Sequence, residues 1–194
     1  YTLMIIGTLA VTGFPLLSGF YSKDAIIEFA YLRGNTSGYY AAGVGIFTAF
    51  LTSIYSWRLI FKTFHGSYNN KNIKIDETHE SPLVMLIPLI LLSIGAIFAG
   101  FTFKDLFIGN LVGNDFWGKS ILFLKPLSTE HPPLWFLIFT PILVTIAIPI
   151  SYYLFVKNKV LPETIVSMNQ PLYNFLINKW YFDELYEFIF IKTS

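Results

Sequence analysis

The sequence predicts an all-α protein: a polytopic transmembrane helix bundle of four spans, with a discontinuous first span and a C-terminal amphipathic helix. Composition is one reason, because 54% of the 194 residues are hydrophobic and only 13% are charged, about half the charged share of a typical soluble domain. The other reason is four apolar stretches, each long enough to cross a hydrocarbon core of about 30 Å as a helix of roughly 20 residues. They run from Leu3 to Leu32, from Tyr39 to Phe64, from Ser81 to Phe103 and from Pro132 to Val156.

A helix-breaking run interrupts the first apolar stretch, at Gly13, Pro15, Ser18 and Gly19. Lys23 follows the break directly. Interrupted membrane helices expose backbone dipoles and place ionisable groups near the middle of the bilayer. A lysine in hydrocarbon is costly and by default marks a functional site. The first stretch therefore predicts ion or proton movement.

Lys23 has no acidic partner on its own predicted helix face. The residues three and four positions away are glycine, phenylalanine and isoleucine, so a partner must come from another helix, from water, or be absent. Hydrocarbon favours the neutral amine, whereas water or a nearby acid favours the ammonium, so such a lysine can load and release a proton. The alternative is that the helix ends near Phe14 and that Lys23 extends its charge to the interface.

Asp24 is predicted to lie about 100° around the helix axis from Lys23. It shares its face with Glu28, four residues further on, so the two carboxylates can form a coupled pair. A simpler interpretation is that Glu28 is an interface residue close to the end of the span, and we favour it.

The next two spans have recognisable ends. Residues 34–38 (Gly-Asn-Thr-Ser-Gly) are typical of a short turn, so the first two spans are predicted to be antiparallel neighbours. The second span ends with Arg58 and Lys62, which either anchor the helix at the interface, the favoured interpretation, or bind a lipid phosphate or a subunit. The third span is predicted to begin with Ser81 as N-cap and Pro82 as the first helical residue.

The last predicted helix is amphipathic. Between Leu172 and Ile191, apolar residues recur at helical spacing, and Asp183, Glu184 and Glu187 stand between them. This pattern is typical of a helix that lies along the membrane or against a partner.

Basic residues near the span ends predict the orientation in the membrane. Six lie on the side of the 65–80 connection and four on the other side; the six are Arg58, Lys62, Lys71, Lys74, Lys157 and Lys159, and the four are Arg33, Lys104, Lys119 and Lys125. The excess predicts that the 65–80 connection and the C-terminal tail lie on the cytoplasmic or matrix side.

Other functional classes find no support in the sequence. A net charge of +1 gives no case for nucleic acid, which needs a clustered basic face. The absence of cysteine excludes thiol catalysis and Fe–S ligation, and no two of the three histidines have the spacing of metal ligands, so no metal site is expected. The chain begins inside one apolar run and stops directly after another, which indicates a fragment of a longer protein.

Four segments, in order along the chain, resemble one family of membrane proteins. Residues 8–24 resemble the broken helix of the antiporter-like subunits of respiratory complex I. Residues 52–66 and 79–85 (His-Glu-Ser-Pro-Leu-Val-Met) resemble the following helices of chain 5, called subunit L in bacteria. Residues 178–186 (Asn-Lys-Trp-Tyr-Phe-Asp-Glu-Leu-Tyr) resemble the segment that leads toward the long lateral helix of that subunit.

The resemblance implies a proton-translocating membrane subunit of NADH–quinone oxidoreductase. It implies that Lys23 and Asp24 transfer protons, and Glu28 and Arg58 are the supporting candidates. Residues 1–66 would form the end of the antiporter-like proton-channel domain and residues 67–194 a C-terminal extension.

The resemblance also implies where the subunit works. No cofactor is expected on this chain, because NADH, FMN, the Fe–S clusters and quinone belong to other subunits. The expected partners are other membrane-arm subunits and the lipid bilayer of a bacterial cytoplasmic or mitochondrial inner membrane. The alternative is a subunit of a multisubunit Na⁺/H⁺ antiporter of the Mrp type, which shares the broken helix. A third possibility is an inert structural bundle.

Overall fold

The computed structural model describes residues 1–66, 80–107, 116, 120, 132–158 and 160–191. The elements in these ranges are all helical, which confirms the predicted all-α class. They are α1 (Thr2–Thr12), α2 (Ser18–Leu32), α3 (Thr36–Phe64), α4 (Leu83–Phe107), α5 (Leu134–Tyr152), the π-helix η2 (Tyr153–Lys157), α6 (Val160–Met168), α7 (Gln170–Ile177), the 3₁₀-helix η3 (Lys179–Tyr181), α8 (Phe182–Tyr186) and the π-helix η4 (Glu187–Ile191).

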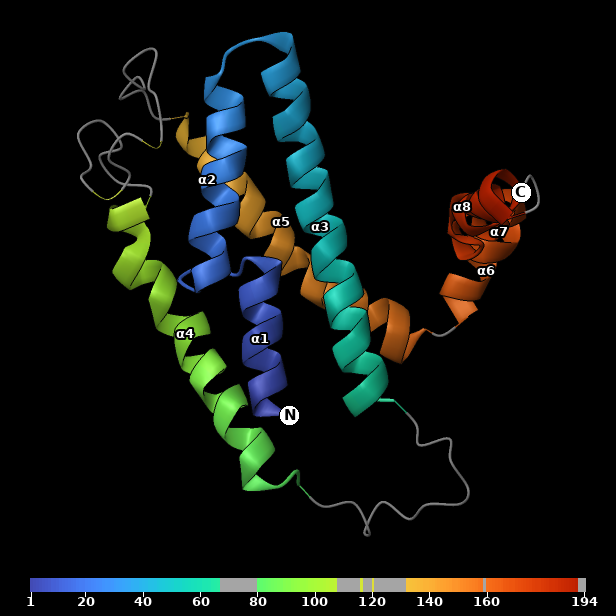
Figure 1. Ribbon diagram of the computed structural model, residues 1–194, viewed down its shortest axis with the longest axis horizontal. Coiled ribbons are helices and arrows are strands. Elements are labelled where there is room, and N and C mark those ends of the chain that lie inside the picture. The colour runs from blue at the N-terminus through green and yellow to red at the C-terminus, as the bar shows by residue number, and fades with distance from the viewer. Residues whose placement is uncertain (67–79, 108–115, 117–119, 121–131, 159, 192–194) are drawn as a thin grey trace.

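Three of the described helices are long and apolar enough to cross a membrane: α3, α4 and α5 together with η2. The first predicted span is divided into α1, with 11 residues, and α2, with 15. Neither half reaches the roughly 20 residues of a full crossing. Figure 1 shows α1 and α2 following each other with a short break between them. The fourth crossing, which α1 and α2 would make together, stays a prediction.

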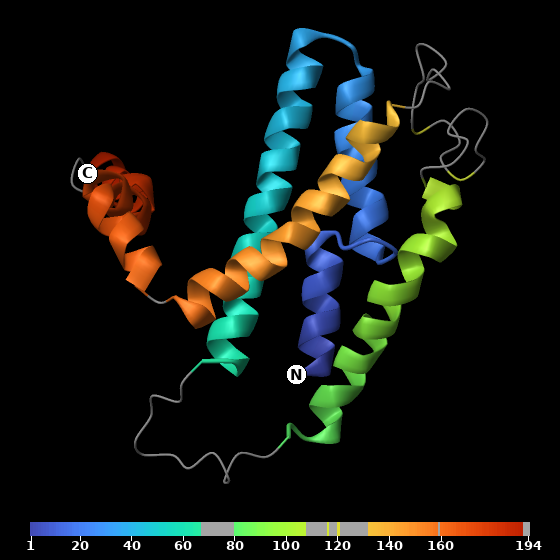
Figure 2. The same ribbon diagram turned by 180° about the vertical axis from the view of Figure 1, so that it is seen from behind.

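The bundle is arranged around α2 and α3, which run antiparallel and side by side (Figures 1 and 2). Asn35 caps α3, because its side-chain oxygen accepts a hydrogen bond from the Gly38 amide at 2.7 Å, and so stabilises the tight turn between them. Helix α5 crosses α3 diagonally, and α4 packs along α1 and α2 on the other side. The C-terminal helices α6 to α8 lie apart from the bundle.

Small residues, hydroxyl groups and two apolar clusters form the contacts between the helices; the clusters are Ile27, Ala42 and Phe136, and Trp57, Ile60 and Phe61. The fully buried Ser53 hydroxyl on α3 donates a hydrogen bond to the carbonyl oxygen of Val144 on α5, at 3.0 Å. Ala147, also fully buried, lies one turn further along α5. Many other large apolar side chains point outward, such as Leu91 and Leu92 of α4, which are 69% and 67% exposed. So large an exposed apolar surface is typical of a helix bundle that meets lipid or further membrane helices.

Two helix ends differ from the sequence-based predictions. Ser81 as the N-cap of α4 is wrong: the carbonyl oxygen of Pro82 accepts the amide hydrogen bond of Leu86 at 3.2 Å, so Pro82 caps the helix and Ser81 lies outside it. The C-terminal amphipathic segment is helical but divided at residues 179–181, which have φ angles of +52°, +64° and +57°. Left-handed residues cannot continue a right-handed helix, so the chain turns between α7 and α8.

The break between α1 and α2 depends on a glycine. A Cβ atom on Gly19 would lie 1.8 Å from the carbonyl oxygen of Ala10, so the first turn of α2 packs directly against the backbone of α1. Only a residue without a side chain permits this approach.

Replacing Gly19 with alanine is therefore expected to separate α1 from α2 and to destabilise the protein by about 1–3 kcal/mol, as overpacking usually does. The thermal unfolding midpoint of the full-length membrane protein in detergent measures the effect. Gly43→Ala is the matched control, because a Cβ on Gly43 of α3 meets nothing within 4 Å. Equal midpoints for the two variants would contradict the close approach.

Candidate functional site

The site begins where α1 ends. Gly13 has φ +81°, and its amide donates to the carbonyl oxygen of Ala10 at 3.2 Å while the Phe14 amide donates to that of Leu9 at 3.0 Å. This pair of hydrogen bonds is a Schellman cap, which requires a left-handed residue and so favours glycine. Two of the last carbonyl groups of α1 are thereby satisfied within the break.

The side chain of Lys23 binds a third carbonyl group at the end of α1. Its ammonium nitrogen donates a hydrogen bond to the carbonyl oxygen of Val11, at 2.5 Å. A Cβ atom on Gly13 would lie 3.3 Å from Cδ of Lys23, so the lysine side chain passes across the break to reach α1. The carboxyl end of a helix carries the negative end of its dipole, which stabilises an ammonium group there. The partner that sequence reasoning left open is a backbone carbonyl of the preceding half-helix.

A hollow of about 520 Å³ surrounds this contact. Val11 and Gly19 line it beside Lys23, and α3 contributes Thr52 and Tyr55. Side chains from α3 thus bring two hydroxyl groups to the cavity that holds the lysine.

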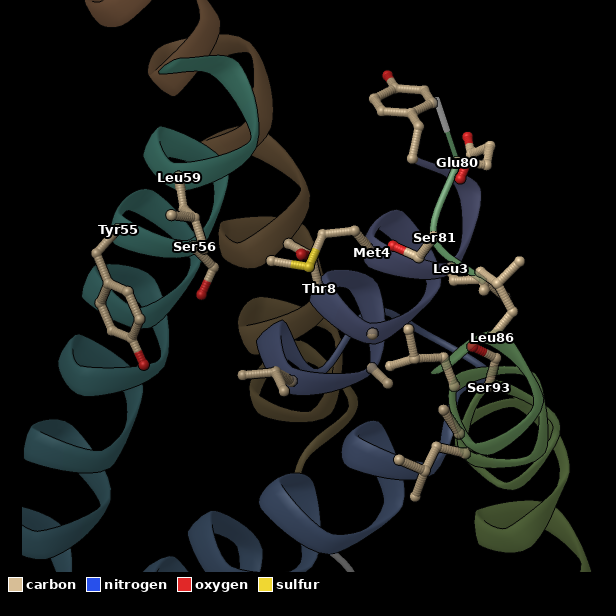
Figure 3. Close-up of a pocket in the computed structure, with 17 residues that line it drawn as sticks. Leu3, Met4, Thr8, Tyr55, Ser56, Leu59, Glu80, Ser81, Leu86 and Ser93 are labelled. Atoms are coloured by element: carbon tan, nitrogen blue, oxygen red, sulfur yellow. The ribbon is translucent and has the colours of Figure 1, made fainter. Parts of the chain in front are cut away.

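A larger groove of about 630 Å³ adjoins this hollow and shares Ala10, Val11 and Tyr55 with it. Figure 3 shows the groove around α1, with Tyr55, Ser56 and Leu59 of α3 on one side and Leu86 and Ser93 of α4 on the other. Its lining is mainly apolar, with one carboxylate, that of Glu80, and with hydroxyl groups at Tyr1, Thr8, Tyr55, Ser56, Ser81 and Ser93.

Asp24 faces a different hollow, of about 230 Å³, on the α4 side of α2. Glu28 lines the same hollow, as expected for residues four positions apart. Lys104 and Asp105 of α4 complete its charged lining, and the Lys104 ammonium lies 5.6 Å from the centre of the Tyr21 ring. Helix geometry therefore separates Lys23 from Asp24.

Lys104 and Asp105 were not predicted to belong to the site, because the predicted span ended at Phe103. Helix α4 continues to Phe107, which carries both residues onto the face that meets α2. The only sequence signal for this extension was the position of Lys104, because a cation is favourable in the last turn of a helix. That signal is weak, since a basic residue can equally follow the end of a helix.

Ser18 connects the break to α4. Its hydroxyl donates to the carbonyl oxygen of Gly95 at 2.9 Å and accepts from the amide of Gly100 at 2.8 Å. A Cβ on Gly100 would lie 2.4 Å from Cα of Ser18, so the two helices cross at contact distance. Pro15, the remaining predicted break residue, lies in the connection between α1 and α2. Its neighbour Leu16 has a positive φ of +74°.

Arg58 lies away from both Lys23 and Asp24. It projects from the exposed surface of α3, with its guanidinium carbon 5.5 Å from the centre of the Phe155 ring. It lines neither the hollow at Lys23 nor the one at Asp24. Across the described ranges, no cluster of three or more histidine, aspartate or glutamate side chains could hold a metal ion.

Comparison with known proteins gives homologues over almost the whole chain. The chain is 41% identical to NADH-ubiquinone oxidoreductase chain 5 of Phytophthora infestans, over 97% of its own length. It is 38% identical to the protein of the same name from Marchantia polymorpha, over 96%, and 35% identical to that of Acanthamoeba castellanii, over 98%. The chain spans 29% of the length of each of these relatives. No protein-family model matches it.

Ser18→Ala is expected to weaken the packing of α2 on α4. The variant loses two hydrogen bonds and leaves two backbone groups of α4 without their side-chain partner, at a cost of roughly 1–3 kcal/mol. The thermal midpoint of the full-length protein measures it against Ser22→Ala, whose hydroxyl bonds Gly19 in its own helix at 3.3 Å. If Ser18→Ala were as stable as Ser22→Ala, the bridge to α4 would contribute nothing.

Proposed function

The chain is homologous over almost its whole length to part of NADH-ubiquinone oxidoreductase chain 5, and on this premise we propose that it forms part of a proton path in the membrane arm of respiratory complex I. Electron transfer through NADH, FMN, Fe–S clusters and quinone takes place in other subunits and drives proton translocation here. The subunit lies among other membrane-arm subunits in an energy-transducing membrane, bacterial cytoplasmic or mitochondrial inner. Residues 1–66 contribute the end of its proton-channel domain, and residues 67–194 form the extension.

One observation carries the proposal: the Lys23 ammonium lies against the carbonyl end of α1, inside an interrupted apolar helix. A protonated lysine is held there by the Val11 carbonyl oxygen and the helix dipole. A neutral amine can still donate to the Val11 carbonyl oxygen, but it loses the charge that makes such a hydrogen bond about twice as strong, so release of the proton weakens the hold of α1 on the side chain. The contact therefore distinguishes the two protonation states of Lys23, as a proton carrier requires.

The surroundings of Lys23 support the same proposal. The Thr52 and Tyr55 side chains line its hollow. The Thr52 hydroxyl donates to the Thr48 carbonyl oxygen at 2.7 Å and can only accept from the amine, whereas the Tyr55 hydroxyl can both donate and accept and is the group we assign to proton exchange with Lys23. Asp24 lies on the other side of α2, beside Lys104. We assign it to a second step of proton transfer, on the α4 side.

The names of the relatives do not favour the Na⁺/H⁺ antiporter, the alternative that the broken helix alone left open. The inert bundle makes a different prediction for Lys23, which the next experiment tests.

Lys23→Ala is expected to remove proton translocation through this subunit, because a positioned proton-transfer group commonly contributes about a hundredfold or more in rate. The number of protons translocated per quinone reduced should fall, measured in membrane vesicles that contain the assembled complex. Lys157→Gln is the control, since it removes an exposed lysine at the end of η2. An unchanged proton-to-quinone ratio in assembled Lys23→Ala complex would contradict the role of Lys23.

Asp24→Asn is expected to lower the same ratio, whereas Glu28→Gln should leave it near that of the parent complex. Both substitutions keep the shape of the side chain and remove one negative charge from the same hollow, so they are matched. The reverse order, with the larger loss in Glu28→Gln, would show that proton transfer on this side belongs to Glu28.

A further inference from the structure

Two cations on α3 share one aromatic ring. The guanidinium carbon of Arg58 lies 5.5 Å from the centre of the Phe155 ring, and the ammonium nitrogen of Lys62 lies 5.9 Å from it. Phe155 belongs to the π-helix η2 at the end of α5 and is half-buried, while both cations are exposed. Cation–π attraction therefore holds two positive side chains, from successive turns of α3, close to the same aromatic ring.

The arrangement concentrates positive charge. Like charges at positions i and i+4 of a helix repel each other, and Lys157 adds a third cation two residues beyond Phe155. Among the residues that the structure describes, a salt bridge joins Lys179 to Asp183, and none of these three cations takes part in it. An anion placed between Arg58 and Lys62 would turn this repulsion into attraction.

The depth of the pair fits the headgroup layer of a membrane. Helix α3 has 29 residues, a length of about 43 Å at 1.5 Å per residue, which exceeds a hydrocarbon core of roughly 30 Å. Arg58 and Lys62 are the only charged residues of α3 and both lie in its last two turns; because a charge in hydrocarbon is costly, this is the end that extends toward the headgroups. Phe61 packs there against Trp57 and Tyr152, with ring centres 5.4 Å and 5.5 Å away, and such aromatic groups are enriched at the membrane interface.

We propose that Arg58, Lys62 and Phe155 form a binding site for the phosphate group of an anionic phospholipid. The guanidinium group can bind two phosphate oxygens at once and the ammonium a further one. Phe155 keeps both cations in place, and the exposed Leu51, two turns before Arg58 on the same side of α3, is placed to contact an acyl chain. The site is separate from Lys23 and does not depend on the function proposed for it.

Photo-crosslinking tests the site in the intact complex. The assembled complex is reconstituted in phosphatidylcholine vesicles that contain a phosphatidylglycerol analogue with a photoactivatable headgroup, and cross-linked peptides from α3 and η2 are quantified. Two basic residues near an anionic headgroup are each worth about 1 kcal/mol, so Arg58→Gln/Lys62→Gln should lower the cross-linking yield about tenfold to thirtyfold. Lys71→Gln/Lys74→Gln, which removes two charges from the connection that follows α3, should leave it unchanged.

Competition identifies the source of the phosphate. Unlabelled phosphatidylglycerol should displace the probe, whereas phosphatidylcholine and millimolar inorganic phosphate should not. Displacement by inorganic phosphate would show a site for a soluble anion, and equal losses in the two double variants would show attraction by general surface charge; either result overturns the proposal. If the Gln double variant fails to assemble, Phe155→Leu replaces it, and a yield unchanged from the parent complex would contradict the role of the ring.

Discussion

The structure depends on how an interrupted helix satisfies its backbone inside an apolar environment. A free carbonyl or amide group costs several kcal/mol in hydrocarbon, so a break in a membrane helix needs partners for every group it releases. Here the Gly13 cap serves Leu9 and Ala10, and the Lys23 ammonium serves Val11. The break and the lysine therefore depend on each other. The ammonium group that we propose to carry the proton also supplies a hydrogen bond to a carbonyl group that the break leaves without a helical partner.

This arrangement divides the functions of α2 between its two sides. The hollow at Lys23 opens between α1 and α3, whereas the hollow at Asp24 and Glu28 lies toward α4. Consecutive residues of a helix point in directions about 100° apart. The neighbouring residues Lys23 and Asp24 therefore reach two different cavities. Ser18 and Gly100 hold α4 close to the second cavity, which links the position of α4 to the geometry of the break.

The sequence was sufficient for features that follow from local chemistry. Apolar length predicted the helices, the Gly-Pro-Ser-Gly run predicted the break, and the spacing of Asp24 and Glu28 predicted their common face. It was insufficient where a partner comes from a backbone atom or from a distant helix. No residue pattern marks the Val11 carbonyl as the partner of Lys23, or Gly95 and Gly100 as those of Ser18. Lys104 was assigned to a connection because helix ends are poorly defined by hydropathy alone, and nothing in the sequence announced the left-handed turn at residues 179–181.

In the proposed function, Lys23 gains and loses a proton at the break while the complex works. Solid-state NMR of the assembled complex with ¹⁵N-labelled lysine side chains tests it directly, because the Nζ resonance of an ammonium differs from that of a neutral amine, and Lys23→Arg assigns the Lys23 signal by its disappearance. If Lys23 carries the proton, NADH-driven turnover shifts its signal between the ammonium and amine forms. A signal that remains entirely ammonium at rest and during turnover would contradict it.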